Sequence, residues 1–203
     1  GEIREQELQG MRPLAPPART VGMEEPSRMD IAEEARLVRR ARWGSREAFE
    51  TIYSRHSRAV YVLALRLSGN PATAEDITQE TFLKLLRFLD TLAPDRPLRP
   101  WLKRVASNAA IDRLRRDRPS VEFDELSVAG NVEPATEADA ALGLLRRFPP
   151  LVRTVVWLQV VEGWTHRELA ERFGRSESWS KSLVSRTVAR LREMMEQDDD
   201  ARS

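Results

Sequence analysis

The spacing of apolar residues constrains the fold of this chain more than any other feature. From Met29 onward, apolar side chains recur every three or four positions, as on one face of a helix, and no stretch alternates as a half-buried strand would. Glycine- and proline-rich breaks divide this pattern into segments of ordinary helix length. Helices are predicted over 31–43, 48–67, 73–89, 101–116, 142–148, 151–161, 165–174 and 176–195. The expected fold class is therefore all-α.

Capping residues and prolines predict where several of these helices begin and end. Thr73 is followed three residues later by Asp76, and Thr165 by Glu168, the capping-box arrangement that satisfies free N–H groups at a helix start. Three prolines within residues 90–100 predict a loop there, because proline lacks a backbone donor and fixes φ.

An acidic segment divides the helical pattern into two parts. Residues 120–141 contain six Asp or Glu and no Lys or Arg, and they lack helical periodicity. This composition is typical of a flexible, self-repelling linker. The predicted organisation is a disordered extension over 1–28, a first helical domain over 29–118, an acidic linker over 119–140, a second helical domain over 141–196 and an acidic tail over 197–203.

Two basic segments flank the linker. Residues 96–118 carry eight Lys or Arg against two Asp, and residues 172–192 carry six Lys or Arg against Glu177 alone. Each segment by itself is more typical of a solvated helix face. The pair, separated by an acidic spacer, indicates two places where nucleic-acid phosphates are bound.

Composition excludes several classes of function. The chain has no cysteine, so disulfides, thiolate metal sites and cysteine nucleophiles are excluded, and its two histidines lie far apart in sequence. No cofactor or metal is expected. No phosphate-cradling glycine loop, metal-spaced acidic pair or nucleophile with a base is present, so the chain is not expected to be an enzyme. No apolar run is long enough to span a membrane, and we expect a cytoplasmic protein without membrane insertion.

The last two predicted helices form a helix-turn-helix pattern. A short helix ends at Gly174, and Ser176 begins a longer basic helix. In such a motif the second helix enters the major groove of DNA. The side chains expected to contact an upstream DNA element are Ser176, Trp179, Lys181, Ser182, Leu183 and Arg186.

Three stretches, in order, give the chain a family resemblance. The first covers residues 44–56 and the sequence Ala-Glu-Asp-Ile-Thr-Gln-Glu-Thr-Phe at 74–82, and the second is the basic helix from Trp101. The third is the helix-turn-helix with the residues that precede it, from Pro149 to Arg186. Together these stretches resemble the extracytoplasmic-function group of sigma factors, over about residues 31–195.

This resemblance implies a function and its partners. Such a protein binds core RNA polymerase, through its beta and beta-prime subunits, recognises the minus ten and minus thirty-five promoter elements, and promotes melting of promoter DNA. It therefore contacts both duplex and single-stranded DNA, and an anti-sigma factor is expected to control it. Catalysis belongs to the polymerase.

The resemblance also assigns residues. Polymerase binding is expected from Asp76, Gln79, Glu80 and Phe82, although Phe82 is equally typical of a core residue. Asp112 is expected to orient neighbouring arginines, and Trp101 to lie in the core. The side chains expected to contact the downstream element are Leu92, Asp95, Arg96, Arg99, Lys103, Arg104, Asn108, Arg115 and Arg116.

The sequence departs from the family in two places. The resemblance assigns the loop at 92–99 and Asn108 to a pocket that holds a base taken out of the stack. Residues 93–97 of this loop are richer in proline than is usual, so the identity of the captured base does not carry over from the family. The recognition helix carries Trp179, Ser180 and Leu183 where the family usually has a small polar residue, a valine and an arginine. Apolar contacts to thymine methyl groups are therefore expected in place of a guanine-reading arginine.

A stand-alone helix-turn-helix regulator is the main alternative. Such a protein would bind duplex DNA by itself, commonly as a symmetric dimer. The match at 76–82 and the basic helix before the linker argue against it.

Overall fold

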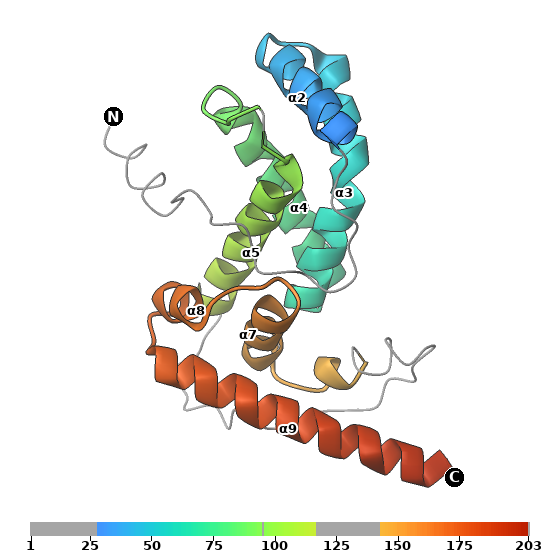
Figure 1. Cartoon of the computed structure of the whole chain (residues 1–203), viewed down its shortest axis with the longest axis vertical. Helices are drawn as coiled ribbons and strands as arrows, with labels where there is room; N and C mark the ends of the chain where they lie inside the picture. Colours follow the sequence, from blue (N-terminus) through green and yellow to red (C-terminus); the bar gives the residue numbers. More distant parts are fainter. Residues whose placement is uncertain (1–27, 95, 117–142, 203) are drawn as a thin grey trace.

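The computed structural model describes residues 28–94, 96–116 and 143–202, without the side chains of 28–30 and 198–202. All regular secondary structure in these ranges is α-helical, which confirms the expected fold class (Figure 1). The predicted extension at 1–28 and linker at 119–140 fall almost wholly outside the described residues.

A first module is built from four helices around α3. They are α2 (Arg28–Arg42), α3 (Arg46–Ser68), α4 (Pro71–Phe88) and α5 (Leu98–Arg116). The central helix α3 packs against the other three, and α4 also packs against α5. The largest fully buried side chains of this core are Ile52, Leu67, Ile77, Leu85, Leu102 and Ile111.

The ends of α4 and α5 differ from the sequence expectation. The predicted capping box at Thr73 is wrong: Asn70 caps α4, its side chain accepts from the Thr73 amide, and Pro71 occupies the first helical position. The loop before α5 is also shorter than expected. The helix begins at Leu98 with Pro100 in its first turn, where proline is tolerated because those N–H groups have no helical partner.

A second module consists of α7 (Pro150–Val160), α8 (His166–Phe173) and α9 (Glu177–Arg202). The capping box of Thr165 and Glu168 is confirmed at the start of α8, and Gly174 ends that helix in the left-handed conformation. Helices α8 and α9 are thus joined by a glycine turn, as the sequence predicts. Helix α9 continues past the predicted end at Met195.

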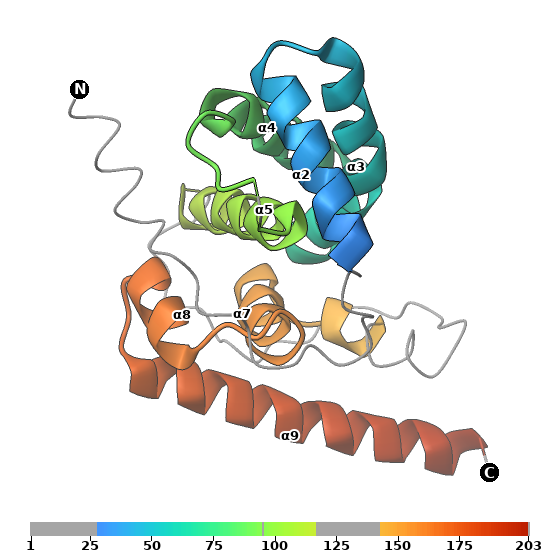
Figure 2. The ribbon, with the colours of Figure 1, turned by 45° about the horizontal axis from the view of Figure 1, so that its top comes forward.

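The two modules pack against each other, which the sequence did not predict. Helix α7 lies against α3, and α5 contacts both α7 and α8 (Figures 1 and 2). The Thr154 hydroxyl donates to the Leu67 carbonyl at 3.2 Å, and the Arg66 guanidinium lies 4.6 Å from the centre of the Trp157 ring. The second module therefore covers the end of the first where α3 ends.

One glycine at this contact yields a prediction. Gly69 has a φ of 70°, and an added Cβ would lie 2.6 Å from Nη2 of the buried Arg153. Gly174 has a similar φ of 65° but open space around its Cα. Gly69→Ala and Gly174→Ala should each lose about 1–2 kcal/mol from left-handed strain, and Gly69→Ala should lose more because Arg153 must move. Urea unfolding measures both, and equal losses would contradict the packing described.

A half-buried carboxylate joins three segments of the first module. Glu34 of α2 accepts from the Leu98 amide at 2.7 Å, and its other oxygen lies 2.7 Å from His56 Nε2. Burial alone would raise the pKa of Glu34, but the hydrogen bonds with His56 and Leu98 outweigh burial and hold this pKa below its ordinary 4.5.

The lowered pKa of Glu34 predicts a pH-dependent stability. A carboxyl whose pKa is lower in the folded chain stabilises the fold above the unfolded pKa, and loses this contribution as pH falls through the folded pKa. Glu34→Gln should therefore unfold more easily than the unchanged protein at neutral pH, and the difference should shrink below pH 4.5. Urea unfolding in a series of buffers measures it. A difference that stays constant with pH would contradict this role.

Candidate polymerase and nucleic-acid interface

Helix α4 presents a polar face to solvent. The side chains of Asp76 and Gln79, one turn apart, are exposed. Glu80 is half-buried and accepts from Arg113 at 2.8 Å, and Lys84 lies 3.1 Å from its other oxygen. Burial would raise the pKa of Glu80, but hydrogen bonds from Arg113 and Lys84 outweigh it and lower the pKa. Glu80 is thus an ionised acceptor already held within the first module.

Phe82 does not belong to this exposed face. Only 4% of its surface is exposed, and its ring lies 6.5 Å from that of Phe49 and 4.6 Å from that of Tyr53. The expectation that Phe82 contacts polymerase is withdrawn, because its ring packs in the core of the first module. Helical spacing explains the difference: Thr78, Phe82 and Leu85 lie on the inward face of α4.

The basic side chains at the centre of α5 are paired with the second module. Lys103 donates to both oxygens of Glu162, at 3.0 and 2.7 Å, and Arg104 donates to Glu168 at 2.9 Å. The Arg104 guanidinium also lies 3.6 Å from the centre of the Trp164 ring. Burial lowers the pKa of Arg104. Burial would raise the pKa of Glu168, but hydrogen bonds from Thr165 and the charge of Arg104 outweigh it, so the pKa of Glu168 is lowered.

A third ion pair continues this contact along α5. Arg172 of α8 donates to Asp112 at 2.7 Å and to the Asn108 carbonyl at 3.4 Å, while Arg115 donates to the Arg172 carbonyl. Asp112 therefore orients an arginine, but one from the other module. We call the three pairs Lys103–Glu162, Arg104–Glu168 and Asp112–Arg172 the inter-module contact.

The other described residues expected at the downstream element do not belong to these three ion pairs. Arg96, Arg99 and Arg116 are exposed, and Leu92 is half-buried. Asp95 lies outside the described residues. Trp101 is half-buried, with its ring 6.5 Å from that of Phe88. The structure thus divides the predicted downstream residues into those paired with the second module at the centre of α5 and those exposed in the preceding loop and at the two ends of α5.

The recognition helix α9 exposes most of its predicted contacts. Ser176, Lys181, Ser182 and Arg186 are exposed, and the Ser176 hydroxyl accepts from the Trp179 amide at 3.1 Å.

Two apolar side chains of this helix turn inward. Leu183 is 2% exposed and lies in the core, so the expected contact from Leu183 to a thymine methyl group is withdrawn. Trp179 is half-buried, with its ring 5.7 Å from that of Phe173. The exposed side chains in the first turns of α9 are therefore polar or charged, and Lys181 and Arg186 are the cations among them.

Sequence reasoning missed the acidic half of the inter-module contact. Glu162 and Glu168 carry no motif for it, and Glu168 was already assigned to a helix cap. Their only signal is charge opposite to the basic segment at 96–118. Arg42 was also missed: its guanidinium donates to the carbonyls of Leu89 and Leu92, which fixes the start of the α4–α5 loop to α2.

The described residues contain neither a membrane-spanning helix nor a cluster of metal ligands. None of the helices there is long and apolar enough to cross a membrane. Nor does this part of the chain bring three His, Cys, Asp or Glu side chains together as metal ligands.

Comparison with known proteins gives consistent matches. The family model for sigma-70 region 2 matches residues 52–119, and that for sigma-70 region 4 matches residues 138–191. The RNA polymerase sigma factor CarQ of Myxococcus xanthus is 32% identical over an alignment that covers 78% of this chain and 95% of CarQ. The ECF RNA polymerase sigma factor BldN of Streptomyces coelicolor is 34% identical, with 85% of this chain and 69% of BldN covered.

Among solved structures, the sigma factor RpoE from Bartonella quintana, in complex with the anti-sigma factor NepR, is also similar. It is 24% identical, with 73% of this chain and 96% of that chain covered, at a TM-score of 0.47.

Proposed function

The chain belongs to the extracytoplasmic-function group of sigma factors, and we propose which of its surfaces bind polymerase and promoter DNA. A sigma factor binds core RNA polymerase and directs it to promoters. One observation carries the assignment of surfaces. Helices α4 and α9 each present exposed polar side chains, and α4 lies in the region 2 match whereas the start of α9 lies in the region 4 match.

We assign polymerase binding to the exposed face of α4. Asp76 and Gln79 offer a carboxylate and an amide to solvent, and Glu80 adds a second carboxylate at the edge of that face. Acidic and amide groups one turn apart suit a basic helical surface of the polymerase, because charge-assisted hydrogen bonds are about twice as strong as neutral ones.

We assign the downstream element to α5 with the loop before it, and the upstream element to α8 and α9. Lys103 and Arg104 are paired with glutamates of the second module, so DNA binds to this part of α5 only after the two modules separate. Phosphates then replace the Glu162 and Glu168 carboxylates as partners of the two cations. The salt dependence of DNA binding follows from such phosphate contacts.

A binding titration tests the polymerase surface. Gln79→Ala should weaken binding of the labelled chain to core polymerase by roughly thirtyfold, the effect of a central interface residue, because its amide partner on polymerase is lost while the fold is untouched. The matched control is Arg87→Ala, an exposed residue two turns further along α4, which should bind like the unchanged chain. Fluorescence anisotropy gives both affinities, and equal affinities for Gln79→Ala and the control would contradict the assignment.

Regulation by a protein inhibitor belongs to the same proposal. Family membership supports an anti-sigma factor that covers the polymerase-binding or DNA-binding faces. It also supports a protein that acts in the cytoplasm and leaves catalysis to the polymerase. A stand-alone regulator is not favoured, because the similarity to CarQ extends over both modules and 95% of that protein.

A further inference from the structure

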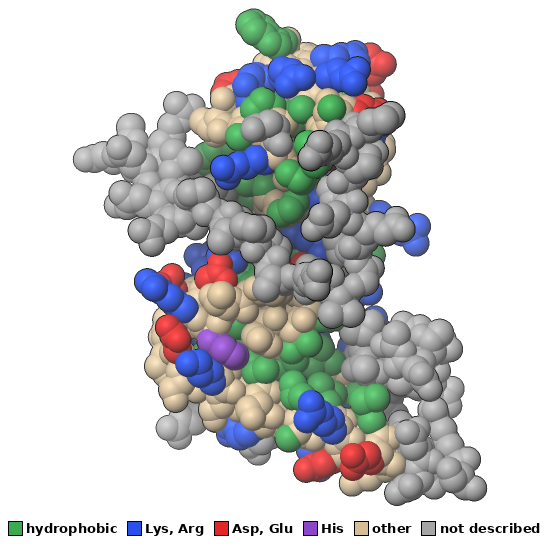
Figure 3. Space-filling model, viewed as in Figure 1, with side chains coloured by type: hydrophobic (Ala, Val, Ile, Leu, Met, Phe, Trp, Pro, Cys, Tyr) green, Lys and Arg blue, Asp and Glu red, His purple; other side chains and the backbone are tan. Residues whose placement is uncertain are grey.

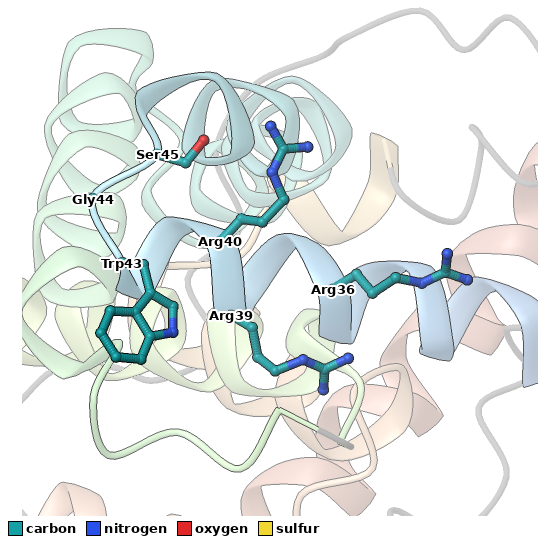
Figure 4. A pocket seen from close by; sticks show the side chains of 6 residues that line it. All are labelled: Arg36, Arg39, Arg40, Trp43, Gly44 and Ser45. Carbon is teal, nitrogen blue, oxygen red and sulfur yellow. The ribbon is translucent and has the colours of Figure 1, made fainter.

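A basic pocket lies at the end of α2, apart from the residues assigned above. Arg36, Arg39, Arg40, Trp43, Gly44 and Ser45 line it. Figure 4 shows Trp43 and Arg39 pointing to the same side of α2, with Arg36 further along the helix. The pocket is a shallow, open surface, and its arginine and tryptophan side chains extend into solvent.

Trp43 is the most unusual residue of this pocket. The chain has five tryptophans, and the other four are buried or half-buried, whereas Trp43 is 89% exposed. A large aromatic ring left in water does not contribute to the core, and exposed aromatic rings are the surfaces on which single-stranded bases stack.

The arginines beside Trp43 are available for phosphates. Arg36, Arg39 and Trp43 are spaced by three and four residues, which places them on one face of α2. Neither Arg36 nor Arg39 forms an ion pair within the described residues, while Arg40 pairs with Glu47 at 2.9 Å. Figure 3 shows Lys and Arg side chains gathered at this end of the molecule. The face combines positive charge with an exposed ring.

The end of α2 that carries the pocket is hydrogen-bonded to the loop assigned to the downstream element. Arg42, the residue before Trp43, donates to the Leu89 carbonyl at 3.0 and 2.8 Å and to the Leu92 carbonyl at 2.7 Å. The end of α2 is thus fixed beside the α4–α5 loop, and both ribbon views show the two segments together (Figures 1 and 2). A DNA strand held by that loop would therefore lie beside the end of α2 that carries Trp43.

A contact with polymerase suits this pocket less well. Asp76 and Gln79 lie ten or more residues before Leu89 on α4, roughly 15–20 Å away along the helix axis. The pocket is also basic, whereas the α4 face is acidic. A basic surface of polymerase that binds the α4 face would therefore be repelled by the pocket.

We propose that the pocket at the end of α2 binds single-stranded DNA of the melted promoter, with Trp43 stacked on one base and Arg36 and Arg39 on neighbouring phosphates. This inference rests on the proposed function, because it places the pocket next to the downstream-element loop. It adds a base contact outside the loop and α5.

The test uses the full chain assembled with core polymerase and a promoter fragment that carries a premelted bubble. Trp43→Ala should bind the bubble roughly five- to a hundredfold more weakly, the range that loss of one stacked base gives, and Trp43→Phe should restore most of the affinity. Arg39→Ala should weaken binding and reduce its salt dependence. Arg46→Ala, which removes another exposed charge, one paired with Glu50, should do neither.

Abasic sites introduced one by one along the non-template strand locate the base. At one position the abasic site should weaken binding of the unchanged protein and have no further effect on Trp43→Ala. If Trp43→Ala binds the bubble as tightly as the unchanged protein, or if each abasic site affects both proteins equally, the inference is overturned. It is also overturned if Trp43→Ala weakens assembly with core polymerase while the assembled complex binds DNA normally. If the unchanged protein itself fails to bind the bubble with polymerase, the proposed function fails with it.

Discussion

Phe82→Ala should lower the free energy of unfolding by about 3–5 kcal/mol, the cost of truncating a buried phenylalanine. The ring is 4% exposed and contacts the rings of Phe49 and Tyr53, so its removal leaves a cavity between α3 and α4. Urea unfolding measures the loss.

The neighbouring residue provides the control for this variant. Leu83 is 54% exposed, and Leu83→Ala should change the unfolding free energy by no more than about 0.5 kcal/mol. Similar losses for the two variants would show that Phe82 does not lie in the core. In that case its original assignment to the polymerase surface would return.

Glu162→Lys should open the molecule. Lys103 and Glu162 form the most buried pair of the inter-module contact, with side chains 19% and 10% exposed, and the substitution places two ammonium groups where one ion pair was. Breaking a buried pair in this way costs about 3–5 kcal/mol. Separation of the modules relieves that cost, so the ratio of closed to open molecules should fall by a hundredfold or more.

Energy transfer between two dyes measures this opening. The chain has no cysteine, so Ser54→Cys on α3 and Ser185→Cys on α9, both exposed, allow labelling at two chosen positions. Transfer should drop in Glu162→Lys and recover when Lys103→Glu restores an opposite pair. Transfer that is unchanged in Glu162→Lys would mean that this ion pair does not hold the modules together.

Much of the fold was predictable because it depends on local patterns. Apolar spacing, the glycine at 174 and the capping box of Thr165 act within one or two helical turns, and the structure confirms them. The cap of α4 was misassigned because Asn70 and Thr73 are both good capping residues, and only the position of Pro71 at the helix start separates them.

The site was predictable only in part, because burial depends on contacts between distant residues. Phe82 and Leu183 belong to motifs that suggest partners, yet both lie on inward faces. The inter-module contact joins residues about sixty positions apart, and no local rule connects a glutamate in a helix cap with an arginine of another module. Trp43 was likewise not identified, since a single aromatic residue before a glycine gives no sign of its exposure.

Run-off transcription tests the central claim most directly. Core RNA polymerase is incubated with a promoter library, without the chain, with the unchanged chain and with Gln79→Ala, and the transcripts are sequenced. We expect new start sites only with the unchanged chain, preceded by two shared sequence elements, and their loss with Gln79→Ala although that variant unfolds like the unchanged protein. Start sites that do not depend on the chain, or that Gln79→Ala supports fully, would contradict the account of this protein as a sigma factor that binds polymerase through α4.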